Sequence, residues 1–392
     1  MKYIEKLLKG AEVKWMPLGE VAEIKTGQGV SKNLIAENPG VFPVINSGRE
    51  PLGLINVWNT DNDPIGITSR GAGVGSVTWQ EGKYFRGNLN YSVSIKDDSK
   101  VNTRYIYYLL LHMQINIHAL CTFQGIPALN AVNLKKLLIP LPTFSVQLEI
   151  VRILDKFTTL EAELEAELDC RKWQYEYYRN QLLSLDVMNG EGQRTNNVTW
   201  LTLGEVFETR NGYTPSKANA AFWKNGTIPW FRMEDIRANG GVLKDSIQHV
   251  TPQAIKGKGL FMAGSIIMAT TATIGEHALI TVDALANQRF TNFRVRNSMV
   301  DKLLTKFVYY YFFVIDEWCK QNVNVSSFPS VEIERLKKQP FPIPPLAEQQ
   351  RIVSILDKFE ALTTSISEGL PKEIALRRKQ YEYYRNQLLS FA

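Results

Sequence analysis

The segment Gln174-Tyr-Glu-Tyr-Tyr-Arg-Asn-Gln-Leu-Leu-Ser184 occurs twice in this chain, and the second copy at Gln380–Ser390 is identical in every residue. Two other segments recur with few changes: Trp15-Met-Pro-Leu-Gly-Glu-Val21 as Trp200-Leu-Thr-Leu-Gly-Glu-Val206, and Ile150–Phe157 as Ile352–Phe359. A long internal repeat indicates that one structural unit is used twice. At 392 residues, the chain is long enough for two domains of ordinary size.

The separation between the copies shows where the two halves differ. It is 185 residues for the segment that begins at Trp15, 202 for the one at Ile150 and 206 for the one at Gln174. The first interval is therefore 17 residues longer in the second copy (202 − 185), and the second interval is only 4 longer (206 − 202). Divergent inserts on a shared frame predict two units with different targets.

The divergent stretches, residues 16–143 and 201–345, have the pattern of mixed α/β structure. Short apolar runs bounded by Gly, Pro, Asn and Asp predict strands and turns; they include Val41–Ile45, Ile65–Thr68 and Gly264–Ala269. Each stretch ends in a more helical, aromatic segment, Thr103–Leu120 or Lys302–Asn322. We expect the aromatic side chains of these segments in the core.

A long helix is predicted after each divergent stretch. From Ile150 the apolar residues recur at alternating steps of four and three, with polar Glu161 and Arg171 at two of these positions, and no Gly or Pro interrupts residues 147–186. A helix of about 40 residues would be roughly 60 Å long. The second copy starts near Glu348, and Gly369 with Pro371 is predicted to interrupt it. Because a long helix must bury its apolar stripe, we expect the two helical regions to pair antiparallel, with one globular unit at each end.

Composition narrows the function classes. A net charge of +6 fits a polyanionic partner without establishing one. The longest apolar run, Phe307–Ile315, is far shorter than the roughly 20 residues of a membrane-spanning helix, and the N-terminus has no signal-peptide core. Cys121, Cys170 and Cys319 are too dispersed for a metal site or a disulfide framework. We therefore expect a cytoplasmic protein with no metal and no membrane partner.

Motifs of catalysis are missing from the sequence. It has no Gly-x-x-x-x-Gly-Lys-[Ser/Thr] phosphate loop, no glycine-rich turn suited to S-adenosylmethionine and no Asn-Pro-Pro-aromatic tetrapeptide of adenine methyltransferases. We therefore predict that the chain is not an enzyme and binds no cofactor. Two alternatives are a single-chain DNA methyltransferase or nuclease with an unrecognised active site, and a coiled-coil scaffold without sequence recognition.

Over its whole length the chain resembles the specificity subunits of Type I restriction–modification enzymes. The resemblance rests on the two divergent units, on the proline-rich segments Ile139–Pro142 and Phe341–Pro345 that follow them, and on Gln174–Ser184 and its copy. The Leu-Gly-Glu-Val segments, the run at 368–374 and the loop at 269–275 are also typical of that family.

The resemblance implies an α+β fold with an internal pseudo-twofold repeat. Two mixed α/β target-recognition domains, residues 1–143 and 187–345, would be separated and joined by two long, antiparallel, coiled-coil-like helical regions at 144–186 and 346–392. Each domain would read one half of a bipartite, asymmetric site in double-stranded DNA, and the helical pair would set the spacer. The helices would also dock two modification subunits, which carry S-adenosylmethionine and methylate adenine; two restriction subunits can join such complexes.

A tandem tetrad in the first helical region suggests how a spacer could be set. Leu160-Glu-Ala-Glu is followed directly by Leu164-Glu-Ala-Glu and then Leu168. One interpretation is an ordinary solvated helix face; the other is a length module. A further tetrad would add about 6 Å of helix, close to two base pairs at about 3.4 Å each.

Candidate DNA contacts are Arg, Asn, Gln, Ser, Thr and neighbouring residues in loops, where glycine permits close approach. For each, the alternative is a turn residue or a surface cation. In the first domain they are Gln28, Ser47, Arg49, Ser69, Arg70, Arg86, Asn88 and Asn90. In the second they are Tyr213, Thr214, Arg232, Asp235, Thr270, Thr271, Thr273, Gln288 and Arg289.

Overall fold

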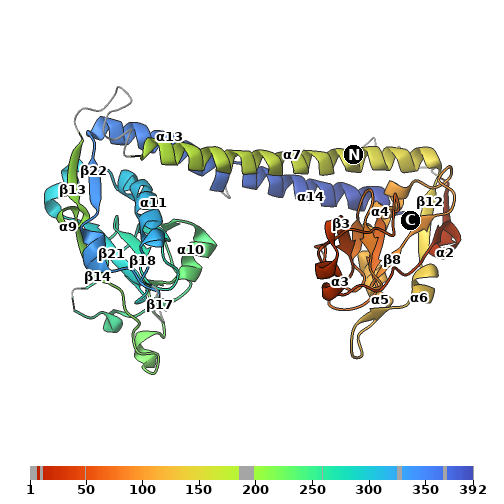
Figure 1. Cartoon of the computed structure of the whole chain (residues 1–392), viewed down its shortest axis with the longest axis horizontal. Coiled ribbons are helices and arrows are strands. Elements are labelled where there is room, and N and C mark those ends of the chain that lie inside the picture. Colours follow the sequence, from red (N-terminus) through yellow and green to blue (C-terminus); the bar gives the residue numbers. More distant parts are fainter. Residues whose placement is uncertain are drawn as a thin grey trace. The chain divides into compact units, whose positions relative to one another are not determined.

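The computed structural model describes residues 7–8, 12–48, 50–184, 198–257, 259–324, 329–364 and 369–391. The chain divides into two compact units (Figure 1). Unit 1 comprises Met1–Leu164 and Ile374–Ala392, and unit 2 comprises Glu165–Glu373. Mixed sheet and helix in each unit, with long helices between the repeated segments, confirm the predicted fold class.

Unit 1 contains short strands in small sheets. The strands are β1 (Val13–Pro17), β2 (Ala22–Glu23), β3 (Pro39–Ile45), β4 (Leu54–Ile55), β5 (Ile65–Thr68), β6 (Val77–Trp79), β7 (Phe85–Arg86), β8 (Asn90–Ser92), β9 (Ser94–Ile95), β10 (Cys121–Thr122), β11 (Ala128–Leu129) and β12 (Leu138–Pro142). They pair in the orders β1-β12, β2-β9, β4-β3-β7, β6-β5-β8 and β10-β11. The helices are α2 (Leu18–Val21), α3 (Lys32–Glu37), α4 (Thr103–His112), α5 (Gln114–Ala119) and α6 (Ala131–Lys135).

Unit 2 repeats this plan and contains a five-stranded sheet. The strands are β13 (Thr199–Thr202), β14 (Phe207–Asn211), β15 (Ile228–Phe231), β16 (Val242–Leu243), β17 (His249–Val250), β18 (Ile266–Ala269), β19 (His277–Ile280), β20 (Leu285–Ala286), β21 (Phe290–Val295) and β22 (Pro340–Ile343). The sheet orders are β13-β22, β14-β21-β18-β19-β16 and β17-β15-β20. The helices are α9 (Leu203–Val206), α10 (Met233–Asn239), α11 (Thr305–Gln321) and α12 (Ile333–Lys337), with 3-10 turns at Ala220–Phe222, Pro252–Ala254 and Asn297–Lys302.

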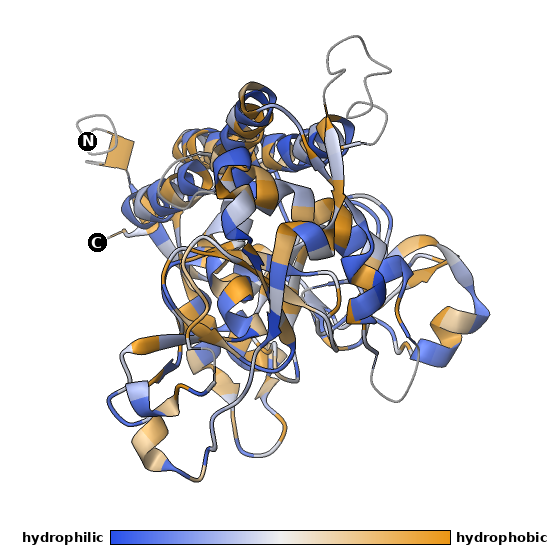
Figure 2. Ribbon diagram, turned by 90° about the vertical axis from the view of Figure 1, so that its left-hand side faces the viewer, coloured by the Kyte–Doolittle hydropathy of each residue, from blue (hydrophilic) through white to orange (hydrophobic). Residues whose placement is uncertain are grey.

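The long helices are α7 (Phe144–Leu182, 39 residues), α13 (Leu346–Thr364) and α14 (Leu370–Leu389). The second helical region is thus divided near Gly369, whose φ of 81° a residue with a Cβ rarely adopts. Figure 2 shows hydrophilic and hydrophobic residues alternating along the helices, as expected for elements that bury only one stripe. No helix in the described part of the chain is long and apolar enough to span a membrane.

Both units use parts of the long helices to complete their cores. In unit 1, Ile150 and Leu154 of α7 are fully buried in the same cluster as Tyr105 of α4 and Leu388 of α14. In unit 2, Ile352 and Leu356 of α13 belong to the cluster that contains the aromatic residues of α11. Each compact unit therefore contains part of both helical regions. The boundary predicted between residues 186 and 187 lies outside the described residues.

The helices pair antiparallel within unit 1. The rings of Phe157 and Tyr384 lie 5.1 Å apart, and Arg378 Nε lies 2.6 Å from Glu161 Oε1. A residue later in α7 thus contacts a residue earlier in α14, as expected for an antiparallel pair. In unit 2, the ring of Phe359 on α13 stacks on Tyr178 of α7 at 5.5 Å. Aromatic contacts of this kind add to the apolar area that each helix buries.

An equivalent polar contact ties the aromatic helix of each unit to its long helix. The Tyr108 hydroxyl donates to Asp155 Oδ1 at 2.5 Å in unit 1, and the Tyr310 hydroxyl donates to Asp357 Oδ1 at 2.5 Å in unit 2. Each residue of the second pair lies 202 residues after its counterpart in the first pair. The repeat therefore extends to side-chain hydrogen bonds that position the helices.

Candidate nucleic-acid interface

Four loops of unit 1 meet where its strands end, and we refer to residues 26–30, 46–48, 69–75 and 87–89 as loop cluster 1. Backbone hydrogen bonds hold it together: Gln28 N–H donates to Arg86 O (2.9 Å), Gly87 N–H to Ile45 O (2.7 Å) and Ser69 N–H to Leu89 O (2.8 Å). In addition, the Asn46 side-chain carbonyl accepts from Leu89 N–H at 2.9 Å. Segments far apart in the sequence thus form one surface.

Unit 2 builds a corresponding loop cluster 2 from residues 212–215, 232, 270–275 and 287–289. Its hydrogen bonds match those of unit 1: Tyr213 N–H donates to Ala286 O (2.8 Å), Asn287 N–H to Phe231 O (3.0 Å) and Thr270 N–H to Arg289 O (3.0 Å). The match continues into neighbouring loops, because Gly71 N–H donates to Pro127 O (2.9 Å) and Ala272 N–H donates to Pro329 O (3.1 Å). The two clusters therefore share a backbone, although their sequences have diverged.

A glycine is sterically required at one equivalent position of each cluster. A Cβ on Gly27 would lie 2.3 Å from the carbonyl oxygen of Gly87, and a Cβ on Gly212 would lie 2.2 Å from that of Asn287. No real Cβ approaches an oxygen so closely. This explains why the Thr26-Gly-Gln28 and Asn211-Gly-Tyr213 segments share their glycine and little else.

Cluster 1 brings together most of the residues predicted for the first domain. Gln28, Arg70 and Asn88 are exposed, Ser47 is partly buried, and Ser69 is buried with its backbone engaged in the cluster. Arg49 lies outside the described residues. An amide, a guanidinium and a second amide on one surface supply the donors and acceptors that recognise base edges.

Arg86 and Asn90, both predicted as DNA contacts, are buried and do not lie on the surface of cluster 1. Arg86 is only 3% exposed and donates to the carbonyl oxygens of Ile65 and Asp63, to Asn90 Oδ1 and to the Tyr84 hydroxyl. Burial lowers the pKa of the Arg86 guanidinium and raises the pKa of Tyr84 to about 12. Arg86 instead joins the strands beneath the loops, because a buried guanidinium must satisfy its donors.

Cluster 2 displays a different set of side chains. Gln288 and Arg289 are exposed, and Thr214, Thr271 and Thr273 are partly buried. The Thr214 hydroxyl donates to Gln288 Oε1 at 2.5 Å, which connects the first and last loops of the cluster. Hydroxyls and an amide with one cation again suit contacts with bases and phosphates.

Tyr213 and Thr270, also predicted as DNA contacts in unit 2, form hydrogen bonds inside the protein with their side chains. The Tyr213 hydroxyl donates to Ala254 O and accepts from Lys256 N–H, both at 2.9 Å. Thr270 is buried, with its hydroxyl 2.9 Å from that of Thr291. Both side chains are therefore occupied within the protein.

Asp235, also predicted as a DNA contact, is fully buried and does not lie on the surface of cluster 2. Its two carboxylate oxygens accept from the backbone N–H groups of Arg232 (2.7 Å) and Ile247 (2.6 Å). Arg232 itself is partly buried, with its guanidinium 5.8 Å from the centre of the Trp230 ring. Asp235 thus fixes the start of α10, as an acidic residue in the first helical turn commonly does.

Sequence reasoning missed the β10–β11 hairpin, which adjoins cluster 1. Arg70 forms an isolated bridge with Ala128 in β11, and Leu129 N–H donates to Ser69 O at 2.8 Å. In unit 2, the equivalent bridge joins Thr271 to Ser330. Arg70 and Thr271 therefore occupy the same place in the two units. The only signal in the sequence was the uncharged run Phe123-Gln-Gly-Ile126, which resembles an ordinary turn.

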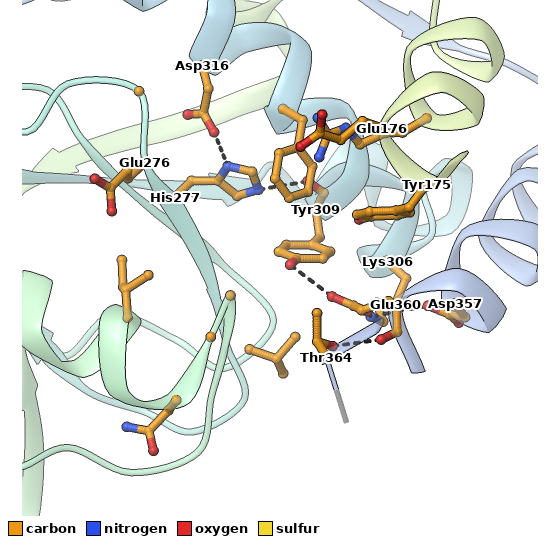
Figure 3. Close-up of a pocket in the computed structure, with 18 of the residues that line it drawn as sticks. Tyr175, Glu176, Glu276, His277, Lys306, Tyr309, Asp316, Asp357, Glu360 and Thr364 are labelled. Carbon is orange, nitrogen blue, oxygen red and sulfur yellow. Dashed lines mark hydrogen bonds and ion pairs between the residues drawn. The ribbon is translucent and has the colours of Figure 1, made fainter. Parts of the chain in front are cut away.

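Unit 2 also contains a groove of about 1670 Å³ between the end of α7, α10, α11 and α13 (Figure 3). Buried His277 lies 2.5 Å from Asp316 through Nδ1 and 2.9 Å from the Tyr309 carbonyl oxygen through Nε2. Both ring nitrogens are thus already used within the protein, so His277 is not placed to exchange a proton with a substrate.

A second polar cluster of the groove is centred on Glu360. Glu360 accepts from Lys306 Nζ at 2.7 Å and from the Tyr309 hydroxyl at 3.0 Å (Figure 3). The Tyr310 hydroxyl also donates to Glu360, at 3.0 Å. These contacts join α11 to α13. Across the described ranges, no group of three His, Cys, Asp or Glu side chains is arranged to hold a metal ion. The groove has the chemistry of a structural joint.

The two loop clusters on a repeated frame define a protein with two similar recognition surfaces. Comparison with known families then gives the affiliation. Residues 11–169 and 196–376 match the model described as the Type I restriction modification DNA specificity domain, and the chain belongs to that family.

Relatives support this assignment over the whole length. The chain is 36% identical to the EcoR124I/EcoR124II specificity subunit of Escherichia coli over 100% of this chain and 97% of that protein. It is 33% identical to a putative specificity subunit of Haemophilus influenzae, over 100% and 98%. The EcoprrI specificity subunit of Escherichia coli is 53% identical, but that match spans only 50% of each chain.

Solved structures share the fold. The specificity subunit of a Type I system from M. genitalium superposes with a TM-score of 0.57 at 18% identity, covering 97% of both chains. A chain from a structure on complex assembly and conformational transition of the type I R-M system gives a TM-score of 0.62 at 15% identity, covering 97% of this chain and 98% of that one.

Proposed function

We propose that this chain is the non-catalytic specificity subunit of a Type I restriction–modification complex and acts on DNA in the cytoplasm. The observation that carries this proposal is the pair of loop clusters with matched backbones and different exposed side chains. A shared frame keeps the mode of approach to DNA constant, whereas the side chains determine the bases recognised. Two such surfaces fit a bipartite, asymmetric site, with one half-site for each unit.

Unit 1 would read its half-site with Gln28, Arg70 and Asn88. Arg prefers the O6 and N7 acceptors of guanine, and amides pair with adenine in the major groove. Unit 2 presents Thr271 where unit 1 has Arg70, with Gln288 and Arg289 close by in cluster 2. Because a hydroxyl and a guanidinium recognise different base edges, the two half-sites should differ in sequence.

The helical regions would set the spacer and dock two modification subunits. Helix α7 starts in unit 1 and continues without a break into unit 2. It leaves Trp173 and Tyr177 exposed in unit 2, and α14 leaves Leu376 and Tyr383 exposed in unit 1. Exposed aromatic and apolar side chains on helices suit partner helices. S-adenosylmethionine would be bound by the modification subunits, and two restriction subunits would complete a cleaving complex.

The first experiment is to sequence the host's DNA with a method that reports N6-methyladenine, with and without this gene. We expect one gapped, bipartite motif to lose methylation on deletion and to regain it when the gene is restored. That result would give both half-sites and the spacer directly. If every methylated motif persists in a host that expresses the partner genes, the proposal is wrong.

A second measurement separates this function from a single-chain methyltransferase. The purified chain is incubated with labelled S-adenosylmethionine and DNA that carries the motif, alone and with the modification subunits. We expect methyl transfer only in the mixture. Transfer by the chain alone would make it an enzyme, and binding without sequence preference would make it a scaffold.

A further inference from the structure

The tip of the β10–β11 hairpin in unit 1 exposes apolar side chains to solvent. Phe123 is 56% exposed and Ile126 is 69% exposed, and Gln124 and Gly125 between them are exposed as well. Residues 119–130 contain no charged side chain. Two large apolar residues at the end of a projecting hairpin are costly to leave in water, so they indicate a binding surface.

The hairpin is held in a defined position next to loop cluster 1. Gly71 N–H donates to Pro127 O at 2.9 Å, and Leu129 N–H donates to Ser69 O at 2.8 Å. These two bonds lie on either side of Arg70, which itself bridges to Ala128. The hairpin and the exposed Arg70 therefore belong to one continuous surface.

Contacts within the hairpin fix the direction of its tip. The Thr122 hydroxyl donates to Ala128 O at 3.2 Å across the two strands. Gly125 turns the chain with a φ of 80°, which glycine adopts without strain. The Phe123 ring stacks on His118 of α5, with centroids 5.3 Å apart. The apolar side chains are thus presented by a braced element, which lowers the entropy lost on binding.

We propose that this tip enters the DNA duplex at the half-site read by unit 1, where Phe123 and Ile126 act as a wedge against the base pairs. This inference rests on the proposed function. An uncharged tip is unsuited to gripping phosphates, which attract Lys and Arg. Apolar side chains inserted between base steps are an established means of unstacking and bending DNA. Continuity with Arg70 assigns the occupant as DNA.

Unit 2 has the same anchoring bonds for such an element. Ala272 N–H donates to Pro329 O at 3.1 Å, and Thr271 bridges to Ser330. Residues 325–328 lie outside the described residues. The inference is therefore restricted to unit 1.

The test uses the full chain assembled with its modification subunits and duplexes that carry the methylated motif. 2-Aminopurine replaces an adenine in one half-site at a time, because its fluorescence rises when it is unstacked. We expect the wild-type complex to raise the fluorescence in the half-site that depends on Arg70. The double variant Phe123→Ala with Ile126→Ala should abolish that rise and weaken binding by roughly tenfold, with no change in the signal from the other half-site.

Two further variants make the outcome decisive. Val132→Ala removes an exposed apolar side chain from α6 and should behave as the wild type. Phe123→Trp keeps an aromatic wedge and should preserve the fluorescence rise. Thermal unfolding of each variant, compared with the wild type, checks that the fold is intact.

Several results would overturn the inference while leaving the proposed function in place. Unchanged fluorescence and affinity in the double variant, with the motif still preferred, would exclude the wedge. Loss of modification-subunit binding, with normal DNA binding by the chain, would assign the tip to a protein partner. If the wild-type complex itself shows no preference for the motif, the proposed function fails first.

Discussion

Gln147 and Gln349 lie 202 residues apart in the sequence and make the same three hydrogen bonds in the two units. Gln147 Oε1 accepts from Asn102 N–H at 2.9 Å, and its Nε2 donates to the carbonyl oxygens of Lys100 (3.2 Å) and Pro142 (2.9 Å). Gln349 makes the equivalent bonds with Leu304 (2.9 Å), Lys302 (2.8 Å) and Pro344 (2.8 Å). Each buried amide thus joins the start of a long helix to the aromatic helix of its unit.

Gln147→Leu should destabilise unit 1 by about 2–4 kcal/mol, because one buried and two partly buried backbone groups would lose the side-chain partner that satisfies them. The equivalent change at Gln349 should destabilise unit 2. Urea unfolding followed by circular dichroism measures the loss, and hydrogen exchange locates it. Gln350→Leu, at the exposed neighbouring position, should be nearly neutral. Equal effects of all three changes would refute a specific role for the buried amides.

Arg70→Ala should weaken recognition of one half-site only. Loss of a guanidinium that contacts a base costs roughly 1–3 kcal/mol, and Arg70 is exposed, so the fold should be unaffected. Competitive gel shifts at fixed salt, with duplexes altered in one half-site at a time, measure the effect. Lys136→Ala removes an exposed cation outside loop cluster 1 and is the matched control. Equal loss at both half-sites would contradict separate reading by the two units.

Insertion of a third Leu-Glu-Ala-Glu tetrad after Glu167 should lengthen the preferred spacer without changing either half-site. The tetrads lie within the continuous helix α7, and four residues add about 6 Å of helix. N6-methyladenine sequencing of a host that carries the variant reads the new motif. Changing Ala162 and Ala166 to serine alters the same surface at constant length and should leave the spacer as it was. An unchanged spacer after the insertion would exclude the tetrads as a length module.

The three cysteines should differ strongly in their reaction with a thiol reagent. Burial, together with the nearby Asp316 carboxylate, raises the pKa of Cys319 to about 12, and a neutral buried thiol is a poor nucleophile. Burial also raises the pKa of the partly buried Cys121. Exposed Cys170 should therefore react first, and Cys319 only on unfolding. Mass spectrometry of labelled peptides identifies the sites, and Cys170→Ser should remove the fast phase. Rapid native labelling of Cys319 would contradict its burial.

Local patterns in the sequence were sufficient to predict most of the elements. The apolar runs at Val41–Ile45 and Ile65–Thr68 lie within β3 and β5, and the heptad pattern, with its two polar interruptions, forms α7. The division at Gly369 also follows from sequence, since only glycine tolerates its backbone conformation easily. Such features depend on side-chain periodicity and on backbone propensity, which are properties of neighbouring residues.

Candidate contacts were harder to predict, because residue type does not reveal burial. Arg86 and Asn88 are two residues apart in one predicted loop, yet Arg86 is buried beneath the strands and Asn88 is exposed on cluster 1. Asp235 looks like a surface acid in the sequence but is surrounded by backbone N–H groups. The hairpin at 121–129 was missed because its one sequence signal, the uncharged run at 123–126, resembles an ordinary turn.

The sequence by itself determined that this chain repeats one frame twice, with two long helical regions and two divergent units, because identical segments and their periodicity are written directly in the order of residues. Only the tertiary structure decided which loops meet, which polar side chains remain exposed and how the helices are shared. Ile150 of helix α7 is buried in the core of unit 1. Leu183, the residue after the end of α7, is buried in the core of unit 2. That division depends on long-range packing, which no local pattern encodes.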